Sequence, residues 1–258
     1  MEQKNSILKN TGVMRDNIYD LLRKGIVEFD LLPGEIISEN SLSTELGVSR
    51  SPLRDALSRL VEENCIVVYP QRGTQISLIS ISRVRQFVFM RTVLEHKIIE
   101  ELCAKGTKPS QIELLYESLA KQRHYHNEQM TSELLAEDRI MHRMLYEFCG
   151  KDSVWNSFHM LSCDTQRIAC LRLRTYSYHT TMTAVENWEN ILIEHKMIID
   201  ALHKRDARSA CLIINRHISQ LIWSCEDLRR IYPQYFDTSE REQEKLNLHF
   251  SIAGEFQS

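Results

Sequence analysis

Residues 46–57 read LGVSRSPLRDAL, and this stretch decides how the N-terminal part of the chain folds. Gly47 permits the left-handed backbone conformation in which many helices end. Ser49 is placed to cap a following helix, and Pro52 fits the first turn of that helix because its missing N–H is not needed there. The stretch therefore predicts the end of one helix, a tight turn, and a second helix over about 51–63.

Further elements are predicted on both sides of this stretch. Apolar residues recur at spacings of three and four before it, and two β-prone runs follow it. The predicted elements are helices over 14–29, 39–46 and 51–63, Asn64 as the left-handed residue after the last helix, and strands over 65–69 and 74–78 joined by Pro70-Gln71-Arg72-Gly73. Three helices and a β-hairpin make a winged helix-turn-helix, which we expect to occupy residues 1–80.

The rest of the chain is predicted to be helical. Apolar residues recur at helical spacing from residue 81 nearly to residue 232, and the interruptions are short. The predicted helices cover 81–105, 109–128, 131–149, 152–177, 184–204 and 207–230. Short links favour antiparallel neighbours, so residues 81–232 are predicted to form an all-α antiparallel bundle, and the whole protein to be mostly α. Residues 233–258 remain as a C-terminal tail.

The composition is typical of a globular protein of the cell interior. Of the 258 residues, 43% are hydrophobic and 26% are charged. No apolar run approaches the ~20 residues that span a bilayer, and the first residues show no signal-peptide core. The seven cysteines form no C-x-x-C pair, which indicates small buried thiols in a reducing compartment. We therefore expect a cytoplasmic protein that does not contact a membrane.

The third predicted helix carries the residues expected to contact DNA. Arg50 and Arg54 lie four apart and share a face near the start of this helix, where side chains reach base edges in the major groove. The candidate DNA-contacting residues are Ser49, Arg50, Ser51, Arg54, Arg72 and Gly73. The alternative is that the arginines only cover a solvated face, since residues 1–80 hold nine Lys/Arg against eleven Asp/Glu.

Four residues of the predicted bundle are of types that bind metal. Asp138 and His142 lie four apart and project from one helix face. His195 and His217 lie about ten residues before and about twelve after one interhelix link, so in an antiparallel hairpin they reach nearly the same height. Three imidazoles and one carboxylate suit a divalent first-row transition ion, with zinc as the first choice and nickel, manganese or iron as alternatives.

A histidine without such companions is more often a surface or hydrogen-bonded residue. We apply this interpretation to His96, His124, His126, His159, His179, His203 and His249.

The N-terminal pattern closely resembles that of a known family. Residues 46–57, followed by Pro70-Gln71-Arg72-Gly73-Thr74, are similar to the N-terminal domain of the GntR family of bacterial regulators, and the resemblance covers 14–80. It implies that the two arginines read bases, while the serines and the wing tip contact the backbone and minor groove. Two positions depart from the pattern. Asn40 stands where FadR relatives carry a further DNA-contacting Arg, and Asn64 replaces the usual Gly before the first wing strand.

Residues 81–230 resemble the FCD ligand-binding domain of the FadR branch of this family. The motifs that carry the resemblance are Arg91-Thr92-Val93-Leu94-Glu95, Asp138-Arg139-Ile140-Met141-His142, Glu194-His195 and Arg216-His217. The resemblance implies that the Asp and the three His hold a metal ion inside the bundle, and that a small carboxylate effector completes its coordination. By the same resemblance Arg91 binds that carboxylate; the alternative is a structural ion pair with Glu95.

Three more arginines lie on a predicted helix that could line the same cavity. They are Arg167, Arg172 and Arg174, and the sequence does not choose among them.

These patterns predict a sequence-specific transcription regulator and not an enzyme. We expect a homodimer that binds a palindromic double-stranded operator, because one winged domain with so few basic residues neutralises few phosphates. A small carboxylate, either a sugar acid or another organic acid, would control DNA binding at the metal.

Two other functions compete with this one. The first is a metal-dependent enzyme acting on a small carboxylate, with Glu137 or Glu194 as the general base. Each adjoins a metal ligand, however, and so points about 100° away around its helix. The second is a structural metal without an effector, in a domain that only dimerises.

Overall fold

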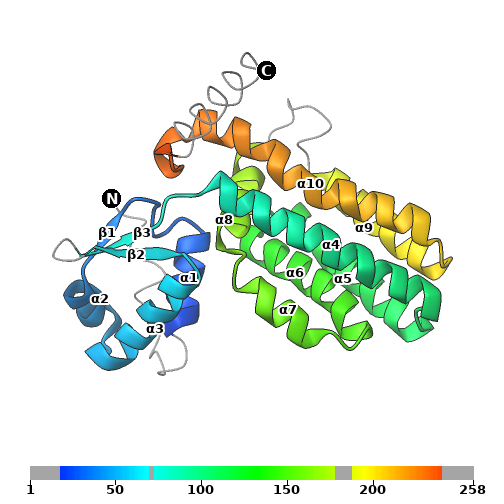
Figure 1. Ribbon diagram of the computed structural model, residues 1–258, viewed down its shortest axis with the longest axis horizontal. Coiled ribbons are helices and arrows are strands. Elements are labelled where there is room, and N and C mark those ends of the chain that lie inside the picture. Colours follow the sequence, from blue (N-terminus) through cyan, green and yellow to red (C-terminus); the bar gives the residue numbers. More distant parts are fainter. Residues whose placement is uncertain (1–17, 70–72, 178–187, 240–258) are drawn as a thin grey trace, which may run out of the picture.

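The computed structural model describes residues 18–69, 73–177 and 188–239, and it shows a small winged helix-turn-helix beside an elongated helical bundle (Figure 1). The predicted fold class, mostly α with an N-terminal winged helix-turn-helix, is confirmed. Some of the predicted elements lie outside the described residues. These are the start of the first helix, the wing tip at 70–72, the start of the helix over 184–204, and the tail beyond 239.

The helices of the N-terminal part lie close to their predicted places. They are α1 (Ile18–Val27), α2 (Glu39–Leu46) and α3 (Arg50–Glu62). Gly47 ends α2 with φ 64°, and Asn64 follows α3 with φ 56°, so both left-handed positions are confirmed. The predicted cap at Ser49 is wrong in one respect. Ser49 occupies the N-cap position of α3, but its exposed side chain makes no capping hydrogen bond.

The wing is a three-stranded antiparallel sheet in the order β1-β3-β2, where a two-stranded hairpin was expected. Its strands are β1 (Ile36–Ile37), β2 (Ile66–Tyr69) and β3 (Gly73–Ile76). The unpredicted strand β1 pairs Ile36 with Gln75 and Ile37 with Thr74. Two residues are too few to show an alternating pattern, and only pairing with β3 makes them a strand.

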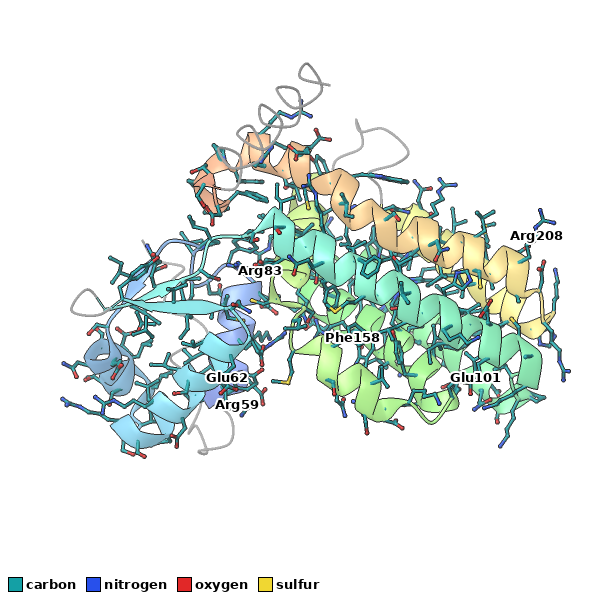
Figure 2. All side chains as sticks on the ribbon, in the orientation of Figure 1. Arg59, Glu62, Arg83, Glu101, Phe158 and Arg208 are labelled. Atoms are coloured by element: carbon teal, nitrogen blue, oxygen red, sulfur yellow. The ribbon has the colours of Figure 1, made fainter. Side chains whose placement is uncertain are left out.

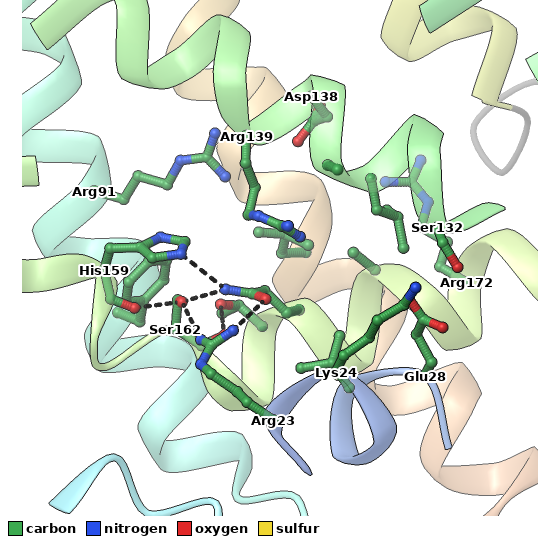
Figure 3. A pocket seen from close by; sticks show the side chains of 18 of the residues that line it. Arg23, Lys24, Glu28, Arg91, Ser132, Asp138, Arg139, His159, Ser162 and Arg172 are labelled. Atoms are coloured by element: carbon green, nitrogen blue, oxygen red, sulfur yellow. Dashed lines mark hydrogen bonds and ion pairs between the residues drawn. The ribbon is translucent and has the colours of Figure 1, made fainter. Parts of the chain in front are cut away.

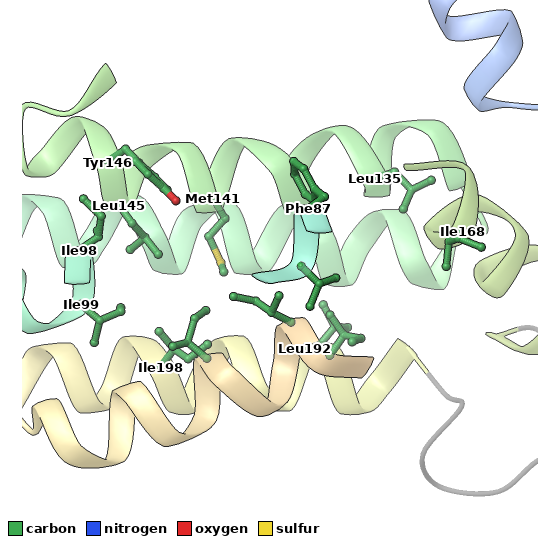
Figure 4. Close-up of a cluster of buried hydrophobic side chains, with 14 of the residues drawn as sticks. Phe87, Ile98, Ile99, Leu135, Met141, Leu145, Tyr146, Ile168, Leu192 and Ile198 are labelled. Carbon is green, nitrogen blue, oxygen red and sulfur yellow. The ribbon is translucent and has the colours of Figure 1, made fainter. Parts of the chain in front are cut away.

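The C-terminal part is a bundle whose longest helices, α4 and α10, lie side by side (Figure 1). The helices are α4 (Ile81–Lys105), α5 (Pro109–Asn127), α6 (Thr131–Phe148), α7 (Asp152–His159), α8 (Cys163–Arg172), a π-helical turn (Leu173–Ser177), α9 (Trp188–His203), α10 (Ala207–Ile231) and a 3₁₀ turn (Pro233–Tyr235). Aliphatic and aromatic side chains from several helices fill the space between them (Figure 4). Within the described residues, no helix is both long enough and apolar enough to cross a bilayer.

One predicted helix, over 152–177, is wrong: the structure breaks it into α7, α8 and the π-helical turn. Apolar residues recur through the whole segment, so periodicity alone does not mark the break. Both helices contribute to the bundle core, but the start of α8 also packs into the N-terminal core. Trp155 and Phe158 of α7 pack on Tyr146 in the bundle, whereas Cys163 at the start of α8 packs into the N-terminal core. The chain must change direction between them, and Leu161 is left 44% exposed at the bend.

The two parts of the protein are joined through buried polar contacts at α8. Arg167 is fully buried; its Nη1 donates to the Ser77 carbonyl at 2.6 Å, and its Nη2 pairs with Asp164. Asp164 also accepts a hydrogen bond from Arg83 Nε at 2.7 Å. Figure 2 shows Arg83 at this junction and Arg208 at the far end of the bundle. The buried Arg167 guanidinium therefore ties α8 of the bundle to Ser77 of the N-terminal part.

We predict that Arg167→Met lowers the free energy of unfolding by about 3–5 kcal/mol, because it leaves the Asp164 carboxylate and the Ser77 carbonyl buried without this partner. Urea unfolding followed by circular dichroism measures the loss. Arg208→Met, at an exposed position of α10, should change stability by no more than about 0.5 kcal/mol. Equal small effects of both substitutions would contradict the assigned role of Arg167.

Candidate metal centre and DNA-reading face

Four side chains from three helices converge inside the bundle: Asp138 and His142 of α6, His195 of α9 and His217 of α10. One ligand atom from each lies within 4.8 Å of the other three. His217 Nε2 is 3.2 Å from His142 Nε2 and 3.4 Å from His195 Nε2, and Asp138 Oδ1 is 3.5 Å from His195 Nε2. Ligands about 2.1 Å from one ion lie about 3.0–3.4 Å apart in octahedral or tetrahedral geometry, so the donor set fits a single ion.

Each imidazole is oriented by an oxygen at its other ring nitrogen. Nδ1 of His142 lies 2.8 Å from Glu95 Oε2, Nδ1 of His195 lies 2.9 Å from Gln122 Oε1, and Nδ1 of His217 lies 3.1 Å from Glu194 Oε2. An Nδ1–H that donates to oxygen leaves the lone pair on Nε2, which is the tautomer that metal binding at Nε2 needs. The three lone pairs therefore point to one place.

Burial keeps the rings of His195 and His217 uncharged. Burial and the neighbouring imidazoles lower the pKa of His195 well below its ordinary value, and burial together with His142 does the same for His217. Both rings are neutral near pH 7, so no proton competes for Nε2. Burial by itself would raise the pKa of Glu95, but Arg91 and His142 lower it to about 2. Glu95 is thus a permanent anion behind His142.

The three orienting residues are what sequence reasoning missed. Glu95 was considered only as a partner of Arg91, and Glu194 only as a general base, whereas the structure places each against a histidine. Gln122 carried no signal at all. It lies on a predicted helix, as many glutamines do, so its position in the sequence does not distinguish it.

A cavity of 440 Å³ opens beside the cluster, and Asp138, His217 and Arg91 line part of it. Figure 3 shows Arg91 and Arg139 projecting into this space. Arg91 Nε donates to Glu95 Oε1 at 2.6 Å, so the expected ion pair is formed. Within the described residues its two Nη groups form no hydrogen bond. Arg91 is thus both paired and able to bind a ligand.

Of the three arginines left open by the sequence, only Arg172 lines the cavity. Arg167 is used at the junction with the N-terminal part, and Arg174 is exposed beyond α8. The cavity also reaches α1, whose residues Arg23 and Lys24 contribute to its wall. A helix of the winged domain therefore closes one side of the space beside the metal-type cluster.

The predicted DNA-contacting residues gather at the start of α3. Ser49, Arg50, Ser51 and Arg54 are all exposed, and the stripe that packs inward is Leu53, Ala56, Leu57 and Leu60. Arg54 Nε lies 3.0 Å from Glu39 Oε2, an exposed ion pair that costs little to break. Gly73 begins β3 with φ 97°, and Arg72 lies outside the described residues.

Comparison with known proteins agrees with both halves of this description. Residues 14–76 match the bacterial regulatory proteins of the gntR family, and residues 86–220, more than half of the chain, match the FCD domain. The protein is a GntR-family transcriptional regulator with an FCD domain. The first match contains Arg50 and Arg54, and the second contains Arg91 and the four clustered residues.

Relatives and solved structures extend over most of this GntR regulator. The HTH-type transcriptional repressor RspR of Escherichia coli is 27% identical over 229 residues, which are 89% of this chain and 96% of RspR. E. coli McbR/YncC has a similar fold, with a TM-score of 0.67 at 18% identity over 86% of this chain and 100% of the other. A GntR-type regulator from Rhodococcus sp. RHA1 aligns with a TM-score of 0.62 at 18% identity, covering 81% and 95% of the two chains.

We predict that Gln122→Met weakens zinc binding about 10- to 100-fold, because His195 loses the oxygen that fixes its tautomer and ring orientation. Competition against a fluorescent zinc chelator measures the change. Gln86→Met, at an exposed position of α4, is the matched control and should leave zinc affinity unaltered. Identical affinities for both variants would show that Gln122 does not support the centre.

Proposed function

We propose that this regulator binds specific DNA sequences under the control of a small carboxylate, a sugar acid or another organic acid, which binds at a metal ion in the FCD domain. The supporting observation is the convergence of three Nε2 lone pairs and one carboxylate beside a cavity that Arg91 also lines. An anion in the cavity can reach the metal and the arginine together.

The donor set favours a divalent transition metal, with zinc as the first choice and nickel, manganese or iron as alternatives. Calcium and magnesium prefer oxygen ligands, which the cluster supplies only through Asp138. A bound ion would act as a Lewis acid that attracts a carboxylate to its open positions. The chain contributes the buried ligands and the oxygens behind them.

Arg91 would supply a charge-assisted hydrogen bond to the effector carboxylate. Its pairing with Glu95 supports this role rather than competing with it, because Glu95 holds only Nε and so leaves the planar end of the guanidinium toward the cavity. The same Glu95 orients His142. One buried carboxylate would thus place both the metal ligand and the effector-binding group.

At the other end of the protein, Arg50 and Arg54 would read base edges in the major groove, with Ser49 and Ser51 on phosphates and the Arg72-Gly73 wing tip at the minor groove.

We also propose that the protein is a cytoplasmic homodimer that binds a palindromic operator. Phe89 and Val93 lie one turn apart on α4 and are 70% and 54% exposed, which supports an apolar contact between two copies.

Catalysis is not part of the proposal. Glu194 holds His217 and accepts a hydrogen bond from Gln220 at 2.7 Å, so it is not a free base. Neither Glu194 nor Glu137 lines the cavity. Relatives such as RspR are named as transcriptional regulators.

A purely structural metal is disfavoured by the cavity, because a closed coordination sphere does not need an adjoining space with an arginine in it.

We predict that replacing Arg50 and Arg54 together by alanine weakens binding to a specific duplex about 30-fold or more, since each bidentate contact with guanine is worth about 1–3 kcal/mol. The duplex is one selected by the wild-type protein from a random library, and fluorescence anisotropy at fixed salt gives the affinity. A double variant of Lys204 and Arg208, exposed at the far end of the bundle, removes the same charge and should bind normally. Undiminished binding by the arginine variant would refute the assigned DNA-reading face.

We predict that at least one acid in a panel of sugar acids, hydroxy acids and dicarboxylates raises the melting temperature of the zinc-loaded protein. At about 100 times its Kd a ligand stabilises by about 2.7 kcal/mol, which is several degrees for a protein of this size. The shift should vanish after chelation of zinc and shrink in Arg91→Gln. A panel without any shift, or a shift that survives chelation, would contradict an effector bound at the metal.

A further inference from the structure

The cavity beside the candidate metal centre is lined by further polar residues besides Asp138 and His217. Residues of α1, α6, α7 and α8 meet there, among them Arg23, Arg139 and His159 (Figure 3). At 440 Å³ the cavity is in the size range of pockets for whole small molecules. A single carboxylate group on the metal would leave most of it unfilled.

Arg139 is the cation of this region that has no partner to neutralise it. It projects into the cavity next to Arg91, and within the described residues it forms no hydrogen bond or ion pair (Figure 3). Its guanidinium lies in the same cavity as the guanidinium groups of Arg23 and Arg91. A partly buried guanidinium with a second one close by is an unfavourable arrangement that a bound anion would relieve.

The lowered pKa of His159 indicates the same excess of positive charge. Burial and then the charges of Arg23, Arg139 and Arg91 lower the pKa of His159 to about 3, so its ring is neutral. The ring is positioned by Gln166 Nε2 at 3.3 Å and by stacking on Trp155. His159 can therefore offer a hydrogen bond without adding charge.

Within the described residues, none of the acidic side chains that line the cavity forms an ion pair with Arg139, and Asp138 among them belongs to the candidate metal cluster. Asp20 and Glu133 are exposed, and Glu28 lies 3.9 Å from Lys24. Arg23 also has a close carboxylate, since its Nε lies 2.7 Å from Glu63 Oε2. Its Nη1 and Nη2 are directed to Gln166 and Ser162, which themselves line the cavity.

We propose that Arg139 is the centre of a second anion-binding subsite, completed by His159 and the Arg23 end of α1, and that the effector of this regulator is therefore a small dianion. One anionic group binds the metal and Arg91, and the second binds Arg139. This inference rests on the proposed function, because it places a second group of the same ligand. It adds the class of acid and the residue that selects it.

The second subsite also touches the DNA-binding part of the molecule. Arg23 belongs to α1, which packs on the reading helix α3, and its guanidinium is tied to both Glu63 after α3 and Ser162 before α8. An anion placed against Arg139 would thus change the electrostatic environment of the contact between α1 and α8. A dianion reaches this contact, whereas a monocarboxylate held at the metal does not.

Isothermal titration of the zinc-loaded full chain tests the subsite with matched probes. Succinate, glutarate and adipate carry two carboxylates, and butyrate, valerate and hexanoate have the same chain lengths with one. We expect at least one diacid to bind about tenfold more tightly than its partner monoacid, because a hydrogen bond to a charged group adds this much. In Arg139→Gln the diacid should lose about 10- to 100-fold in affinity, while the monoacid stays within about twofold.

Two further variants distinguish the subsite from general effects of charge or folding. Arg143→Gln removes the same charge one turn along α6, at a residue that pairs with Glu147 and does not line the cavity, and it should keep the preference for diacids. Arg139→Lys keeps the charge and should retain most of the preference. Equal binding of diacids and monoacids to the wild type, or a preference that survives in Arg139→Gln, would overturn the second subsite and leave the proposed function standing.

The same probes test the contact with the DNA-binding part. The diacid should change affinity for the selected duplex more than its monoacid at equal saturation, and Arg139→Gln should remove the difference. Equal effects of both acids on DNA would overturn the link through α1. If none of the six acids binds but a monocarboxylic sugar or hydroxy acid of the wider panel does, the second subsite fails and the proposed function stands. If no acid of the wider panel binds either, the proposed effector control itself fails.

Discussion

Three buried imidazole nitrogens whose lone pairs face one point repel one another unless a cation lies between them, and the bundle is arranged around this constraint. The rings come from α6, α9 and α10, and the oxygens that hold them in place come from α4, α5 and α9. Five helices therefore contribute side chains to this one small cluster. An ion bound there would lock their relative positions, and any group that enters its coordination sphere would act on all five.

This arrangement connects the candidate centre to the rest of the chain. Glu95 links His142 to Arg91, and Glu194 links His217 through Gln220 to Arg172, which lines the cavity. The opposite wall of that cavity belongs to α1, which packs on α3 and on α8. Arg167, buried beside Asp164, donates to the Ser77 carbonyl and so helps to keep the two parts of the protein docked. Few steps of direct contact therefore separate the candidate metal ligands from the helix that carries Arg50 and Arg54.

Local patterns in the chain predicted much of this. The helix-turn-helix, the left-handed residues Gly47 and Asn64, and most helix limits follow from spacing and turn chemistry, because these depend on neighbours in sequence. The four metal-type residues were also predicted, since an i,i+4 pair and two positions in one hairpin are local relations. The prediction was wrong where long-range packing decides. Strand β1 exists only through β3, and the break between α7 and α8 comes just before Cys163, which packs into the N-terminal core.

The sequence by itself determined the types of element, their order and the candidate residues for binding metal or DNA, because helical periodicity and side-chain chemistry are properties of short segments. The tertiary structure alone decided which residues stand behind the ligands and which arginine lines the cavity. Gln122 contacts His195 although the two are 73 positions apart in the sequence. Arg167 binds Ser77, which lies 90 positions away, whereas Arg172 lines the cavity. Such contacts depend on how whole helices cross, and no local pattern encodes a crossing.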